Sequence, residues 1–116
     1  MSDDSLQTIL EFANKRVTEP EEYELWLSSD KMVHVYIRQL SCAERDYLYD
    51  KYSALLEADD KSLSFFEIMK KRKYPYEVIS MALVKPKITI DQLQELDIWT
   101  FSKLYNLVLN VLGPLD

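Results

Sequence analysis

Three short motifs of one kind divide the chain after residue 40 into helices. Ser or Thr is followed three residues later by Glu or Gln at 41–44, 64–67 and 89–92. In such a capping box the hydroxyl accepts a hydrogen bond from a backbone N–H of the first helical turn, and the Glu or Gln accepts one from the backbone N–H of the Ser or Thr. Because each box sets a helix start, the sequence predicts several short helices in this part of the chain.

The apolar residues after each box recur at helical spacing. The first helix is predicted to run from Ser41 to Glu57, and the second to end in the basic run 70–73, where cations suit the negative end of the helix dipole. The third is predicted over 89–96. Together these helices form the framework of the second half of the chain.

Proline, aspartate and glycine place two further helices. Pro75 suits a first helical turn, which predicts a helix over 75–84. Asp97 can cap a last helix, and Gly113 can end it because glycine adopts the left-handed cap conformation. Before all of these, apolar residues at helical spacing predict an amphipathic helix over 5–17.

Residues 23–39 carry a different periodicity. Apolar and polar side chains alternate over 23–27 and again over 32–39, and the polar segment 28–31 between them is typical of a turn. The second run is rich in β-branched residues, which favour strands. This stretch is therefore predicted to be a β-hairpin with one buried face.

The predicted fold class is α+β and mainly α, with about four to five short helices and one hairpin in the N-terminal half. A chain of this length is expected to form a single domain over 1–116. Within it, 1–20 holds the N-terminal helix, 21–40 the hairpin and 41–113 the helical body.

Composition argues against most enzymatic functions. The chain has 116 residues but only one glycine, one histidine and one cysteine, which leaves no glycine-rich phosphate loop and no cysteine or histidine metal cluster. No stretch approaches the 18 or so apolar residues of a membrane helix. We therefore predict no enzymatic activity, no catalytic, cofactor-binding or metal-binding residue, and no membrane partner.

Charge is unevenly distributed along the chain. The net charge is −6; residues 1–30 carry eight acids against two bases, whereas 61–90 carry seven bases against two acids. The overall acidity argues against nucleic acid as a partner. Opposite charges on separate segments can instead orient self-association. The candidate residues for self-association are Lys70, Lys71, Arg72 and Lys73.

Several phrases of the sequence resemble the small tail assembly chaperones of long-tailed phages. Within 33–52, an extended segment ending in an R-x-L phrase at 38–40 leads into a capped helix with the phrase E-R-D at 44–46. A later helix ends in an L-V-x-P phrase at 83–86, and the last helix closes at Gly113. These phrases lie in the order in which that family carries them.

The resemblance implies a function as well as a fold. A member of this family would be an assembly factor in the cytoplasm of the infected host, binding the long, helix-rich tape measure protein until tail-tube subunits replace it. The family also implies self-association and a longer form made by ribosomal frameshifting. Large aromatic side chains outside a core face often anchor a partner. The candidate client-binding residues, all on the last helix, are Trp99, Phe101 and Tyr105.

A second hypothesis comes from the acidic residues at the front of the chain. A small viral adaptor or inhibitor protein could dock on a host protein through them, with its acidic surface imitating nucleic acid. A strict one-to-one complex would indicate this adaptor, whereas many copies on one long client would indicate the chaperone.

Overall fold

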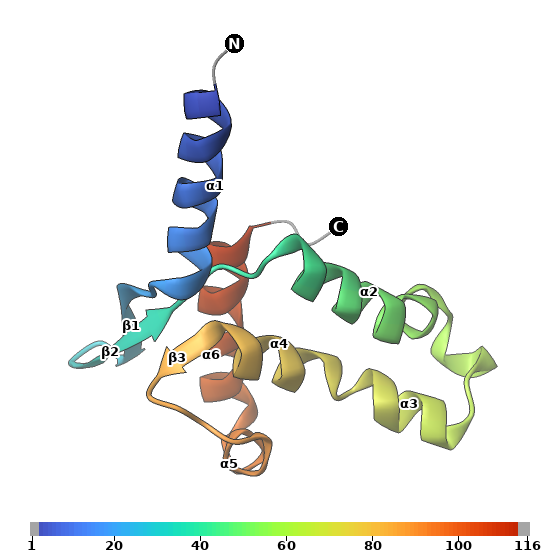
Figure 1. The fold of residues 1–116 in the computed structure, drawn as a ribbon. Helices are drawn as coiled ribbons and strands as arrows, with labels where there is room; N and C mark the ends of the chain where they lie inside the picture. The colour runs from blue at the N-terminus through green and yellow to red at the C-terminus, as the bar shows by residue number, and fades with distance from the viewer. Residues whose placement is uncertain (1–2, 114–116) are drawn as a thin grey trace.

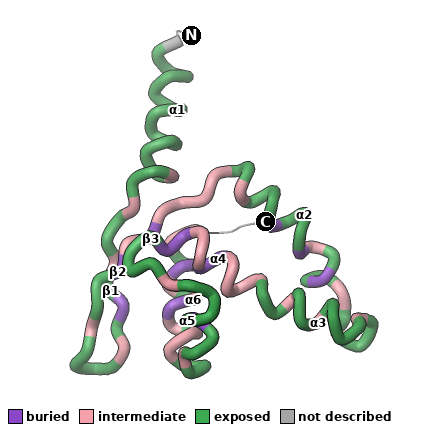
Figure 2. The backbone as a smooth tube through the Cα atoms, turned by 60° about the horizontal axis from the view of Figure 1, so that its bottom comes forward, coloured by how far each residue is buried: buried purple, intermediate pink, exposed green. Residues whose placement is uncertain are grey.

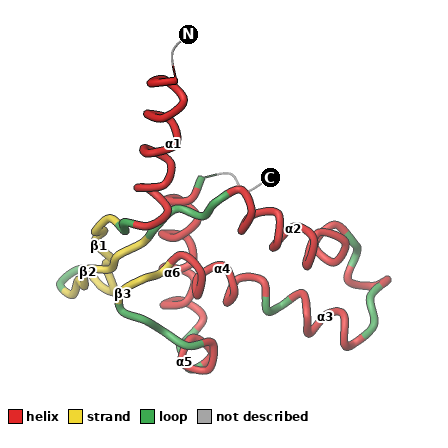
Figure 3. The backbone as a smooth tube through the Cα atoms, viewed as in Figure 1, coloured by secondary structure: helices red, strands yellow, loops and turns green. Residues whose placement is uncertain are grey.

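The computed structural model of the chain describes residues 3–113, with six α-helices, one 3₁₀ helix and three strands in that range (Figures 1 and 3). The fold is α+β and mainly α, as the sequence predicts. In chain order the elements are α1 (Asp3–Thr18), β1 (Glu21–Ser28), β2 (Lys31–Ile37), α2 (Cys42–Glu57), the 3₁₀ helix η1 (Asp60–Ser62), α3 (Phe65–Lys71), α4 (Tyr74–Ala82), β3 (Leu83–Lys85), α5 (Ile90–Gln94) and α6 (Ile98–Leu112).

The helix boundaries follow the predicted caps. All three capping boxes are formed, with Ser41, Ser64 and Thr89 each accepting from a backbone N–H of the helix that follows. Asp97 caps α6 in the same way. Gly113 ends α6 with φ of 73°, a conformation that residues with a side chain rarely adopt. Local side-chain chemistry therefore fixes where these helices begin and end.

One strand replaces part of a predicted helix. The helix expected over 75–84 ends at Ala82, and β3 follows as the third strand of an antiparallel sheet with the order β1-β2-β3. In β3, Leu83 lies opposite Ile37 of β2, and both side chains are buried. A strand of three residues is too short to show an alternation of apolar and polar residues in the sequence. It is recognised as a strand only by its pairing with β2.

The core lies where α2, α4, α5 and α6 meet one face of the sheet (Figure 2, purple). Helix α6 packs on β1, and α4 leads directly into β3. Twelve buried apolar side chains form this cluster: Leu25, Val35, Ile37, Leu48, Tyr52, Val78, Ile79, Ala82, Leu83, Leu93, Leu104 and Val108.

Two parts of the chain extend away from this core. The Cα radius of gyration is 16.6 Å, whereas a compact chain of this length has about 13 Å. Figure 1 shows the reason: α1 stands clear of the sheet, and α2 and α3 extend away from the sheet in another direction. Residues 42–71, which include both of these helices, are here called the α2–α3 arm. Both parts present large surfaces to solvent.

The acidic front of the chain has a structural explanation. Strand β1 is an edge of the sheet, and Glu21, Glu22 and Glu24 on it are exposed. Glu22 pairs with His34 of β2, with 2.7 Å between Oε1 and Nδ1. Charged side chains on an edge strand oppose pairing with other chains. Three of the eight acids of residues 1–30 thus lie on this sheet edge, where their charge opposes pairing with another strand.

Candidate functional site

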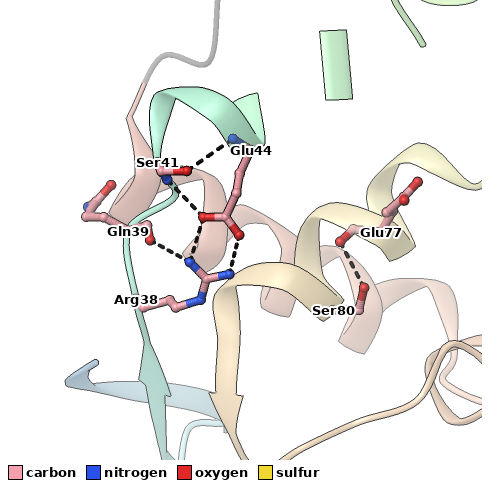
Figure 4. Close-up of polar contacts among 6 residues, drawn as sticks. All are labelled: Arg38, Gln39, Ser41, Glu44, Glu77 and Ser80. Carbon is pink, nitrogen blue, oxygen red and sulfur yellow. Dashed lines mark hydrogen bonds and ion pairs between the residues drawn. The ribbon is translucent and has the colours of Figure 1, made fainter. Parts of the chain in front are cut away.

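The two phrases R-x-L and E-R-D meet in one polar joint between β2 and α2 (Figure 4). Arg38 donates two hydrogen bonds to the carboxylate of Glu44, at 2.8 and 2.6 Å, and a third to the Gln39 carbonyl at 3.1 Å. The same carboxylate accepts from the Ser41 backbone N–H at 2.9 Å. The hydrogen bonds from Arg38 are the main cause that lowers the pKa of Glu44 to about 2. These residues therefore position α2 against the sheet and leave little of the carboxylate available for binding.

A second polar cluster joins α2 to α4. The carboxylate of Glu77 accepts hydrogen bonds from Tyr52, from Tyr47 at 2.9 Å and from Lys51 at 3.1 Å. Burial raises the pKa of Glu77, but the three donors together outweigh burial and lower that pKa below its ordinary value. The backbone carbonyl of Glu77 also accepts from Ser80 within α4 (Figure 4). All of these groups are matched within the protein, which indicates a structural role.

An open apolar groove of about 480 Å³ runs between the α2–α3 arm and α6. Aromatic rings dominate one side of it: the ring centroids of Tyr76 and Phe101 are 5.0 Å apart, and those of Phe101 and Tyr105 are 6.0 Å apart with nearly parallel planes. Leu56 and Ile68 line the groove from the arm. The groove therefore combines an aromatic wall with an aliphatic wall.

The Tyr105 hydroxyl in this groove stays protonated at neutral pH. Burial raises the pKa of Tyr105 to about 12, and the nearby Tyr74 raises it further in the same direction. A neutral phenol can donate or accept a hydrogen bond, while its ring offers apolar contact area. The groove is therefore suited to apolar and aromatic side chains of another protein.

The four residues of the basic run 70–73 have different environments. Lys71 is half-buried and pairs with Asp60 at 2.7 Å, and both line the groove together with Arg72. Lys70 and Lys73 are exposed and lie outside the lining. The structure thus brings two of the four predicted self-association residues together with two of the three predicted client-binding residues.

Trp99 lies away from Phe101 and Tyr105. Residues two apart on an α-helix point in nearly opposite directions. Lys103 lies over the Trp99 ring, with 4.4 Å from Nζ to the ring centroid, and donates to the Trp26 carbonyl at 3.0 Å. Trp99 is therefore not part of the groove, and its predicted client contact would form on a separate surface.

Sequence reasoning missed two further apolar surfaces. Phe65 and Phe66 begin α3, are 71% and 83% exposed, and contact each other edge to face at 5.9 Å. Two adjacent aromatic residues on a seven-residue helix cannot share one face, and this spacing could have indicated the exposure. The second surface is the apolar stripe of α1, which the helical periodicity identified but whose exposure it could not show.

No cation site or membrane span is found in the described range. Among residues 3–113, no three His, Cys, Asp or Glu side chains are grouped so that they could hold a metal ion. None of the helices there combines the length and apolar character needed to cross a bilayer.

Comparison with known proteins found no matching protein-family model, no similar curated protein and no similar solved structure.

Proposed function

We propose that this protein is a non-catalytic chaperone that binds apolar helical segments of another protein through the groove between the α2–α3 arm and α6. The observation that carries this proposal is the amount of apolar surface left open on one small chain: the groove itself and the exposed Phe65 and Phe66 on the same arm. Contiguous exposed apolar surface on a soluble protein commonly marks an interaction site. An elongated groove accepts the apolar face of an amphipathic helix.

The more specific form of this proposal is a phage tail assembly chaperone acting in the host cytoplasm. Its client would be the tape measure protein, and a longer frameshifted form would accompany it. The support is the resemblance of residues 33–113, in which Arg38 and Glu44 form the joint that orients the arm. An open groove also suits the task, since a client held on a shallow surface can be displaced later.

The test is co-expression with the longest helix-rich protein encoded downstream of the gene. A soluble complex that holds several copies of this chain per client, measured by light scattering after affinity capture, is the result expected of the chaperone. If the client stays insoluble while a compact host protein is captured one to one, the adaptor hypothesis replaces it.

Replacing Leu56 with glutamate is expected to reduce the yield of soluble client several-fold. Leu56 lines the groove and is 42% exposed, so a carboxylate there would have to lose its water when an apolar segment binds. The matched control is Ala54→Glu, which places the same charge at an exposed position of α2 outside the groove lining. Equal yields with both variants would mean that the client binds elsewhere.

Reversing two cations of the basic run tests the proposed electrostatic stacking of copies. The double variant Lys70→Glu/Lys73→Glu leaves the Lys71–Asp60 ion pair intact. If copies associate through opposite charges, this variant is expected to sediment as a smaller species at low salt, and wild type is expected to do so as salt screens its charges. Lys31→Glu/Lys87→Glu makes the same charge change at two exposed positions outside the run 70–73 and is expected to sediment like wild type. Unchanged sedimentation of the basic-run variant would exclude stacking through this segment.

A further inference from the structure

Helix α1 is the most isolated element of the described chain. Of its described side chains, Val17 alone is half-buried and the others are exposed, as the green helix of Figure 2 shows. Its last turn is held to the body by a hydrogen bond from the Gln39 backbone N–H to the Arg16 carbonyl, at 3.0 Å. A helix of 16 residues has marginal stability in water without packing. This helix therefore gains most from a surface that covers it.

Apart from Phe12, which is 63% exposed and lies beneath the Arg16 guanidinium on another side of the helix, the apolar residues of α1 form one stripe. One face of α1 carries apolar residues at i, i+3, i+4, i+7 and i+11, namely Leu6, Ile9, Leu10, Ala13 and Val17. Leu6, Ile9 and Leu10 are between 54% and 64% exposed. The opposite face carries polar residues such as Thr8. The stripe has the pattern that one helix presents to another.

The stripe continues into a groove at the foot of α1. This groove has a volume of about 550 Å³, and Ala13 and Val17 form one side of it. Leu40, Val111 and Leu112 form the apolar part of the other side, where the chain enters α2 and leaves α6. Any helix that lies along the stripe would therefore also place one of its ends in the foot groove.

The charges on α1 select the partner and its direction. Asp4 lies in the first turn, whereas Lys15 and Arg16 lie in the last turn, where Lys15 also pairs with Glu19 at 3.9 Å and Arg16 leaves the end with a net positive charge. A second α1 running antiparallel would bring its Asp4 to this basic end. The two helix dipoles would then be antiparallel, which is an attractive arrangement. A parallel second copy would instead place like charges side by side.

We propose that α1 pairs antiparallel with α1 of a second copy of this chain, forming a two-fold dimer. The proposed register places Leu10 of each chain opposite Ala13 of the other. Leu6 of each chain then lies opposite Val17 and the foot groove of the other. The contact is self-complementary, as a two-fold interface requires. It uses none of the groove between the α2–α3 arm and α6, so it does not depend on the proposed client.

The first test measures oligomeric state without any client. Sedimentation in about 1 M salt, where charges are screened beyond roughly 3 Å, separates this apolar contact from electrostatic stacking. Wild type is expected to be a dimer, and Leu10→Asp is expected to dimerise at least about tenfold more weakly, which corresponds to roughly 1.4 kcal/mol. Thr8→Asp adds the same charge to the polar face and is expected to dimerise like wild type. A monomeric wild type, or equal behaviour of the two variants, would overturn the proposal.

The second test establishes direction by cross-linking. In a Cys42→Ser background, which removes the exposed native thiol, chains carrying Leu6→Cys are mixed with chains carrying Val17→Cys and oxidised. A disulfide between the two kinds of chain is expected, because antiparallel pairing brings these positions together. Disulfides between two Leu6→Cys chains alone would show parallel pairing and overturn the arrangement. If Leu10→Asp lost client binding while wild type alone stayed monomeric, the stripe would belong to the client.

Discussion

Replacing Glu77 with alanine is expected to lower the free energy of unfolding by about 2–3 kcal/mol and the melting temperature by about 10 °C. Its carboxylate is 17% exposed and accepts from three donors on α2. Among these, Tyr52 is almost fully buried. Removing the acceptor leaves the Tyr52 hydroxyl without its partner in a place that water reaches poorly, which costs more than losing one exposed hydrogen bond.

The pKa values of Tyr52 and Lys51 also reflect their hydrogen bonds to Glu77. Burial raises the pKa of Tyr52 to about 12, with the hydrogen bond to Glu77 as the next cause. The pKa of Lys51 is also raised, through its hydrogen bonds to Tyr47 and to Glu77. The folded state thus holds a protonated tyrosine, a charged lysine and an ionised Glu77 together. Glu77→Gln keeps an oxygen acceptor but no charge, so its loss of stability is expected to be smaller than that of Glu77→Ala.

A double-mutant cycle measured by chemical unfolding tests this explanation. In a Tyr52→Phe background no buried hydroxyl is left unpaired, so Glu77→Ala is expected to cost at least about 1 kcal/mol less than in wild type. Asp50→Ala removes an exposed carboxylate of α2 and is expected to change stability by less than about 0.5 kcal/mol. If Glu77→Ala cost the same in both backgrounds, the energy would not come from the tyrosine.

Local chemistry explains why so much of the fold could be predicted. The capping box at Ser41 and the polar break after Glu57 define α2, because the groups that start and stop a helix are its own near neighbours in sequence. The hairpin is similar, since its alternation and turn lie within one short segment. In contrast, β3 exists because Leu83 meets Ile37, a contact across 46 positions of the chain that no local pattern records.

Burial was less predictable than secondary structure. The stripe of the last helix includes Ile98, which is 85% exposed, together with Val108, which is fully buried. Periodicity shows that a face is apolar but not whether another element covers it. The same limit applies to α1, whose apolar face is uncovered within the chain. It also applies to the groove, because Phe101 faces the groove only once the α2–α3 arm has been placed beside α6.

The two polar joints show how the uncovered surfaces are held in place. Arg38 and Glu44 fix the start of α2 against the sheet, and Glu77 fixes α2 against α4. The arm is therefore oriented by these hydrogen bonds together with the packing of Leu48 and Tyr52 of α2 into the core, while Phe65 and Phe66 at its far end are exposed to solvent.

Acid is expected to weaken the protein through the first of these joints. Hydrogen bonds from Arg38 are the largest cause that lowers the pKa of Glu44 from 4.5 to about 2. A carboxyl whose pKa is lower in the folded than in the unfolded chain stabilises the fold above its unfolded pKa, and this contribution is lost as pH falls through the folded pKa. The contribution at neutral pH is roughly 2–3 kcal/mol, and it should be lost progressively between about pH 5 and pH 1.

Comparison of wild type with Glu44→Gln isolates this contribution, because every other titrating group is common to both chains. Glutamine retains an oxygen for the Ser41 backbone N–H but cannot form the ion pair with Arg38. Urea unfolding is therefore expected to show wild type more stable at pH 7, with the difference shrinking below about pH 5 and vanishing only below about pH 2, as Glu44 becomes protonated in the folded chain. Glu67→Gln makes the same change in a fully exposed capping box, and a smaller pH-dependent difference is expected there. A difference for Glu44→Gln that stayed constant from pH 7 to pH 3 would show that the ion pair does not stabilise the joint.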